Sequence, residues 1–156
     1  MNEIKFRGKR IDGKGWVYGY LVRKVYGVVP RNGDTESEYA IINGMGGNIT
    51  ACNECGEPDF DIYDVIPETI GQYTGRHDNE NDKELYAGDI LDFVVFDYTG
   101  GDTAYKGIIT WNNEDSAFMI KTKHEDEMFL GLVLSQDDDA EKIGNIYDNP
   151  ELLNKE

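Results

Sequence analysis

Apolar and polar residues alternate over short stretches of this chain, and no long window repeats with the period of an α-helix. The alternation begins with a predicted hairpin, whose strands span residues 4–11 and 16–22. Between them, Asp12-Gly13-Lys14-Gly15 contains residues that tolerate positive φ, as a tight turn requires. We therefore expect the second strand to pair antiparallel with the first.

The second strand of this hairpin carries a row of aromatic side chains. Trp16, Tyr18 and Tyr20 fall on one face, together with Val22, because successive strand residues point to opposite sides. We expect this aromatic face to fill the core, since aromatic side chains bury the most apolar surface. The alternative is an open face on which the rings stack against bases or peptide side chains.

Further short β-branched and aromatic runs follow, separated by Gly, Asn and Asp. They predict strands over residues 39–42, 62–66, 69–74, 89–96, 105–111, 117–121, 128–134 and 143–147. Residues 31–60 otherwise form an irregular excursion, and the polar residues 76–84 form a loop or linker. Asn149-Pro150-Glu151 supplies an N-cap, a first-turn proline and an acid, which predicts a short C-terminal helix.

These elements predict an all-β protein in two parts. Residues 1–78 would form an irregular N-terminal β-sheet, and residues 79–156 a small C-terminal barrel, because strands about ten residues apart suit such barrels. Strand alternation in the second part predicts a buried core. Its expected members are Ile90, Phe93, Val95, Ile108, Trp111, Phe118, Ile120, Leu132 and Ile146.

Charge limits the classes of partner. Of 156 residues, 31 are acidic and 15 basic, and the formal net charge is −16. Such a chain repels phosphate backbones, so we expect no direct nucleic-acid binding. Acidic loops usually serve solubility, and the alternative is a DNA mimic that occupies a DNA-binding site on another protein. No apolar run is long enough to span a bilayer and no signal segment follows Met1, so we expect a cytoplasmic protein without membrane binding.

Several separate motifs occur in an order that resembles the YopX family of phage and prophage proteins. They are Phe6-Arg7-Gly8-Lys9, Trp16-Val17-Tyr18-Gly19, the segment from Pro67 to Gly75, Tyr86-Ala87-Gly88-Asp89-Ile90, Gly107-Ile108-Ile109-Thr110-Trp111 and Ile143-Gly144-Asn145-Ile146-Tyr147. The resemblance implies a largely β protein with an SH3-type C-terminal half, located in a bacterial host cell. It implies no activity and transfers no catalytic residues.

Catalytic and metal-binding signatures are weak. Cys52 and Cys55 form a single CxxC, which is half the ligand set of a structural zinc site, and we expect no zinc. Asp78, Glu80 and Asp82 match the start of a calcium-loop frame, but Lys83 stands where that frame requires glycine. No serine lies in a GxSxG frame. We therefore expect no catalytic residues, metal or cofactor, and no enzymatic activity.

Together with the phage or prophage origin that the resemblance implies, these features predict a non-catalytic accessory protein that acts by protein–protein binding or self-assembly. Its basic N-terminal stretch and acidic remainder favour a homo-oligomer, because opposite charges steer contacts between copies. The candidate binding residues are Arg7, Trp16, Tyr18, Gln72, Tyr73 and Arg76. An acidic DNA mimic that inhibits a host nucleic-acid enzyme is the first alternative, and a carboxylate-dependent metal enzyme the second. The partner remains open.

Overall fold

The computed structural model describes residues 3–24, 37–44, 60–96, 101–124, 126–136 and 139–154. Within these ranges the chain is mostly strand, in antiparallel sheets, with one short α-helix, which confirms the predicted all-β class. Contacts between Cα atoms divide it into two compact units, Met1–Gln72 and Tyr73–Glu156. The domain boundary predicted at residues 78/79 lies a few residues after this division. No helix in the described part of the chain is long and apolar enough to cross a membrane.

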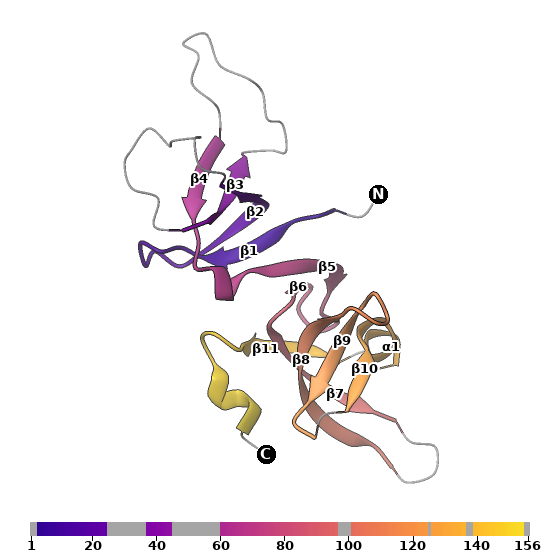
Figure 1. The fold of residues 1–156 in the computed structure, drawn as a ribbon. Helices are drawn as coiled ribbons and strands as arrows, with labels where there is room; N and C mark the ends of the chain where they lie inside the picture. The colour runs from indigo at the N-terminus through magenta and orange to yellow at the C-terminus, as the bar shows by residue number, and fades with distance from the viewer. Residues whose placement is uncertain are drawn as a thin grey trace, which may run out of the picture. The chain divides into compact units, whose positions relative to one another are not determined.

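The first unit is built on an antiparallel sheet with the order β4-β3-β2-β1 (Figure 1). Its strands are β1 (Phe6–Lys9), β2 (Trp16–Arg23), β3 (Tyr39–Gly44) and β4 (Phe60–Asp64). The 3-10 turn η2 (Pro67–Thr69) then leads into β5 (Gly71–His77), whose first two residues pair with β1. The predicted hairpin is therefore present, and part of the strand predicted at residues 69–74 is a 3-10 turn instead.

The core of the first unit lies on the face opposite the aromatic row. Val17, Ile41 and Val65 are its buried members. Tyr18 and Tyr20 are 45% and 47% exposed, so the prediction that the aromatic face fills the core is wrong. The alternation placed these rings together correctly, but the opposite face of β2 is the one that packs against residues from later in the chain.

Gly19, between the two exposed tyrosines, is required for close strand pairing. Its φ is 155°, and a Cβ atom there would lie 2.1 Å from the backbone oxygen of Ile42. A side chain at this position would therefore push β3 away from β2, because a carbonyl in a sheet has no room to move.

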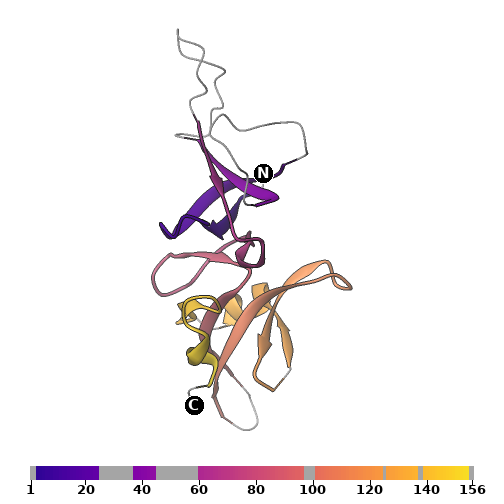
Figure 2. The same ribbon diagram turned by 60° about the vertical axis from the view of Figure 1, so that its left-hand side comes forward.

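The second unit holds a five-stranded antiparallel sheet in the order β10-β9-β8-β7-β11. Its strands are β7 (Asp89–Val95), β8 (Thr103–Asn112), β9 (Ala117–Thr122), β10 (Glu127–Phe129) and β11 (Glu141–Asn145). A short β6 (Glu84–Tyr86) pairs with β5. Helix α1 (Leu130–Gln136) follows β10, and the 3-10 turn η3 (Pro150–Asn154) follows β11 (Figure 2). The short C-terminal helix predicted from residue 149 is thus a 3-10 turn.

The pairings that the structure describes form an open series from β10 to β11 and include none between those two strands. The SH3-like barrel therefore stays a prediction. The predicted strand at residues 128–134 is wrong over most of its length, because α1 begins at Leu130.

The core of the second unit contains part of the predicted set. Its buried members are Leu85, Leu91, Phe93, Ile109, Ile120, Leu130, Val133 and Ala140. Phe93 and Ile120 belong to it as predicted, and Ile90 is also buried, while Val95, Ile108, Phe118 and Ile146 are only partly buried. Trp111 and Leu132 are 47% and 51% exposed, so their placement in the core is wrong. Trp111 stands near the end of β8 beside a turn, and Leu132 lies on the solvent side of α1.

Candidate functional site

The aromatic row of β2 belongs to a larger exposed surface of the first unit. Tyr20 pairs with Ile42 on β3, and Ile42 pairs with Ile62 on β4, so these side chains project from the same side of the sheet. Ile62 is 52% exposed. We call the side formed by Trp16, Tyr18, Tyr20, Ile42 and Ile62 the outer face.

At one end of the outer face, two cationic side chains lie against Trp16. The register places Arg7 opposite Tyr18 and Lys9 opposite Trp16. The Arg7 guanidinium carbon is 4.7 Å from the Trp16 ring centre, and the Lys9 ammonium is 5.6 Å from it. Both distances fit cation–π attraction. Arg7 is only 2% exposed, so it supports the ring from within the fold.

The other basic side chains near the N-terminus have acidic neighbours. Lys5 lies 3.5 Å from Glu3, and Lys14 lies 3.9 Å from Asp12. The remaining ion pairs are Arg10–Asp12, Arg23–Glu38 and Lys24–Asp64. The basic stretch seen in the sequence is therefore largely neutralised within the first unit.

Asp12 fixes the turn between β1 and β2. Its Oδ1 accepts a hydrogen bond from the backbone N–H of Lys14 at 3.1 Å. Desolvation raises the pKa of Asp12, but this hydrogen bond and the Arg10 side chain together hold that pKa below its usual value of 3.8. The Asp12 carboxylate is therefore ionised at neutral pH.

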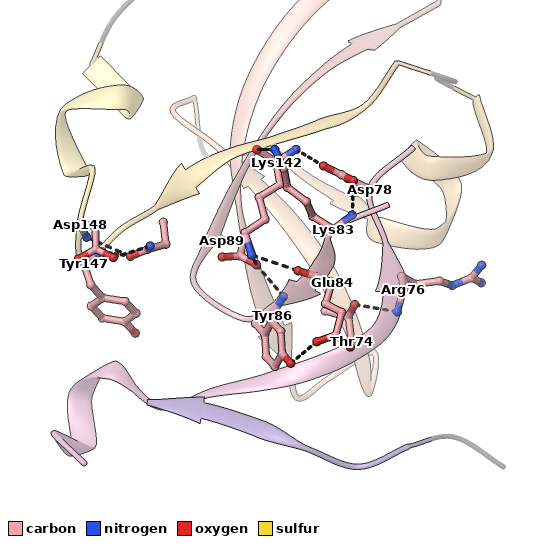
Figure 3. A network of polar contacts seen from close by, with 11 residues as sticks. Thr74, Arg76, Asp78, Lys83, Glu84, Tyr86, Asp89, Lys142, Tyr147 and Asp148 are labelled. Atoms are coloured by element: carbon pink, nitrogen blue, oxygen red, sulfur yellow. Dashed lines mark hydrogen bonds and ion pairs between the residues drawn. The ribbon is translucent and has the colours of Figure 1, made fainter. Parts of the chain in front are cut away.

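In the second unit, a buried carboxylate joins the β5–β6 turn to β11 (Figure 3). Asp78 is 4% exposed. Its Oδ1 accepts hydrogen bonds from the backbone N–H groups of Lys83 at 2.7 Å and Asn81 at 3.2 Å. Its Oδ2 accepts one from the backbone N–H of Lys142 at 3.0 Å. Backbone amides thus hold both oxygens.

A second buried carboxylate, Asp89, lies beside the Lys142 side chain (Figure 3). Asp89 is 0% exposed, and its Oδ2 lies 2.9 Å from the Lys142 ammonium and accepts a hydrogen bond from the Tyr86 backbone at 2.8 Å. The Lys142 ammonium also donates to the backbone oxygen of Glu84 at 3.1 Å. The network therefore links β6, β7 and β11 through one lysine.

The polar network has the composition of a catalytic cluster but the contacts of a structural one. Its two aspartates accept hydrogen bonds mainly from backbone amides, which fixes strands and turns in place. In the described part of the chain, no group of three or more His, Cys, Asp or Glu side chains is arranged to hold a metal. Cys52 and Cys55 lie outside the described residues.

The remaining candidate binding residues do not join the outer face. Gln72 is half-buried and pairs with Phe6 on β1. Tyr73 is 8% exposed and packs in the second unit, with its ring centre 5.4 Å from that of Tyr86. Arg76 is exposed on β5, and its backbone N–H donates to Thr74.

Sequence reasoning missed the Asp89–Lys142 pair and the role of Asp78. With 31 acidic residues, no single carboxylate stands out. One available signal was the pattern Tyr-x-Gly-Asp before a strand, in which the aspartate can accept a hydrogen bond from the backbone three residues earlier.

Comparisons with known proteins give one family and one fold. A family model described as YopX protein matches residues 32–154, which is most of the chain. No curated protein matches. A solved structure, protein EF1440 from Enterococcus faecalis, is similar with 24% sequence identity and a TM-score of 0.52, covering 98% of this chain and 99% of that one. At this identity the likeness concerns the fold alone.

Proposed function

This chain belongs to the YopX family, and we propose that it is a non-catalytic phage or prophage accessory protein that acts by protein–protein binding, first of all by self-assembly. The observation that carries the proposal is the outer face of the first unit. It presents Tyr18 and Tyr20 of β2 and Ile62 of β4 to solvent, and Ile42 of β3 lies between Tyr20 and Ile62 in the register.

The chemistry of the outer face favours an apolar contact. Large exposed aromatic side chains supply most of the binding energy in protein interfaces. Arg7 and Lys9 lie over Trp16, and the nearby basic groups have acidic neighbours, so the face has little charge left to attract a polyanion. A second copy presents the same face, and a two-fold axis lets the two faces pack on each other.

The polar network supports the non-catalytic part of the proposal. A general acid or base needs a proton-accepting atom directed at a substrate. Asp78 and Asp89 are buried, and their contacts include backbone amides and one lysine of the same unit. These two carboxylates hold strands and turns together, and their burial keeps them from exchanging a proton with a ligand.

The mass of the full chain in solution tests self-assembly. Light scattering is expected to give a multiple of 17.7 kDa for the natural chain, at both low and high salt, because the contact is apolar. The double variant Tyr18→Ser/Tyr20→Ser is expected to fall to the monomer mass. The control Phe129→Ser removes an equally exposed aromatic residue from the second unit and should keep the oligomer.

Two outcomes contradict this account in different ways. A mass near 17.7 kDa in both buffers, at all concentrations, rules out self-assembly. An oligomer that dissociates in salt and survives the tyrosine changes would place the contact in the charge asymmetry of the chain.

A DNA mimic is the second candidate, and the charge of the second unit favours it. Residues 73–156 contain 20 acidic and 7 basic side chains, a difference of −13, whereas residues 1–72 contain 11 and 8. A mimic must displace duplex DNA from a host enzyme. Competition by the natural chain that persists in Tyr18→Ser/Tyr20→Ser would favour mimicry over binding through the outer face.

A further inference from the structure

The two tryptophans of this chain lie in opposite electrostatic surroundings. Trp16 has the cationic groups of Arg7 and Lys9 over its ring. Trp111 is 47% exposed, and no lysine or arginine in the described ranges lies over its ring. The first ring is therefore supplied with cations by its own chain, and the second is open to one from outside.

The turn between β8 and β9 holds Trp111 in a fixed orientation. The Asn112 side-chain oxygen accepts hydrogen bonds from the backbone N–H groups of Glu114 at 2.8 Å and Asp115 at 3.1 Å. The Trp111 indole N–H donates to the Asn113 side chain at 3.0 Å. The exposed ring is thus positioned before any partner arrives, which lowers the entropy cost of binding.

Phe118 completes an aromatic corner on the same side of the sheet. Trp111 and Phe118 are paired across β8 and β9. Their ring centres are 5.0 Å apart and the planes meet at 74°, an edge-to-face contact. The contact leaves much of the Trp111 ring open to solvent, which is the surface that a cation or an aliphatic chain would cover.

Two acidic residues belong to the turn that joins the strands of this aromatic corner. Glu114 and Asp115 are exposed in the turn, and neither forms an ion pair with a residue that the structure describes. They belong to the unit with 20 acidic against 7 basic residues. The site therefore combines an open ring, unneutralised negative charge and an attractive field for cations.

We propose that the corner formed by Trp111, Phe118, Glu114 and Asp115 binds a lysine- or arginine-rich segment of another protein. The aliphatic stem of a basic side chain packs on the indole, its charged end lies over the ring, and the turn carboxylates face the next cation of the segment. The basic N-terminal stretch of a second copy is a poor source of that cation, because five of its basic residues have acidic neighbours in their own chain. This surface is separate from the outer face and does not depend on the proposed self-assembly.

Binding of a synthetic basic peptide to the full chain tests the proposal. A ten-residue peptide of lysine, arginine and glycine is titrated by calorimetry, beside a peptide with glutamate in place of the basic residues. Trp111→Leu keeps an apolar side chain but removes the ring, and we expect it to weaken binding by about 2- to 30-fold, the range of a single cation–π contact. Trp111→Phe should retain part of the affinity.

A matched pair of charge variants separates this corner from general attraction. Glu114→Gln should weaken binding more than Glu151→Gln, which removes one exposed charge from η3. Circular dichroism and melting temperature confirm that each variant is folded. Equal binding by Trp111→Leu and the natural chain, equal effects of the two glutamate changes, or no binding of the basic peptide would each overturn the proposal.

Discussion

At the scale of single residues, the strongest prediction concerns Lys142. Its ammonium lies 2.9 Å from Asp89, which is fully buried. Lys142→Met keeps the aliphatic stem and removes the charge, so the Asp89 carboxylate stays buried without its cation. Breaking a buried pair on one side costs about 3–5 kcal/mol of unfolding free energy. Urea denaturation measures this loss.

Lys83 provides the control for that change. Its ammonium lies 3.7 Å from Glu141, and both side chains are about half exposed. Exposed ion pairs contribute about 0–1 kcal/mol, so Lys83→Met should change stability little. If Lys142→Met were equally mild, the Asp89 carboxylate would be stabilised chiefly by its backbone hydrogen bonds.

Residue-level patterns in the sequence predict relative positions better than burial. The alternation of Trp16, Tyr18 and Tyr20 places the three rings on one side, and the structure agrees. Which side is buried depends on Ile41 and Val65, which approach the opposite face from later in the chain. Alternation within one strand does not show which face is buried, because that depends on contacts with residues far away in the sequence.

At the scale of elements, α1 is where the sequence interpretation failed. Its residues Leu130–Gln136 are mostly apolar, and a short apolar run is compatible with a buried strand as well as with a helix. In the helix, Leu130 and Val133 lie three positions apart and both face the core, whereas Leu132 is 51% exposed. A strand would have placed residues 130 and 132 on the same face.

This difference in period gives a direct test of α1. Leu130→Ala is expected to lower the unfolding free energy by about 2–5 kcal/mol, because it leaves a cavity in the core of the second unit. Leu132→Ala should change stability by no more than about 0.5 kcal/mol, as surface substitutions do. Chemical denaturation of the two variants measures both values. Similar losses would indicate that both leucines share a buried strand face.

The short strand β6 was also missed, for a different reason. It has only three residues, Glu84–Tyr86, and follows a polar segment that resembles a linker. Its position depends on the buried Asp78 and on the hydrogen bond from Tyr86 to Asp89, which are contacts between segments. The strands with longer β-branched or aromatic runs, such as β2, β7 and β8, were located from the sequence because their signal is local.

At the scale of the whole molecule, charge is distributed unevenly between the two units. The first unit has 11 acidic and 8 basic residues, and the second has 20 and 7. In the first unit many of these charges form ion pairs, among them Lys5–Glu3 and Lys24–Asp64. The structure shows ion pairs in the second unit as well, such as Lys83–Glu141 and Lys142–Asp89, but its 20 acidic residues far outnumber its 7 basic ones, so most of them have no basic partner.

Added salt should therefore stabilise the second unit more than the first. At about 0.1 M salt the Debye length is about 10 Å, which screens repulsion between exposed carboxylates while weakening exposed ion pairs as well. Relief of about 1 kcal/mol would raise the melting temperature of a domain of this size by about 4–8 °C.

Tryptophan fluorescence can follow the unfolding of each unit separately. Trp16→Phe leaves Trp111 as the reporter of the second unit, and Trp111→Phe leaves Trp16 as the reporter of the first. We expect the transition reported by Trp111 to rise on going from low to moderate sodium chloride, and the transition reported by Trp16 to move less. A Trp111 transition that does not respond to salt would mean that the acidic side chains of the second unit are already spaced too far apart to repel one another.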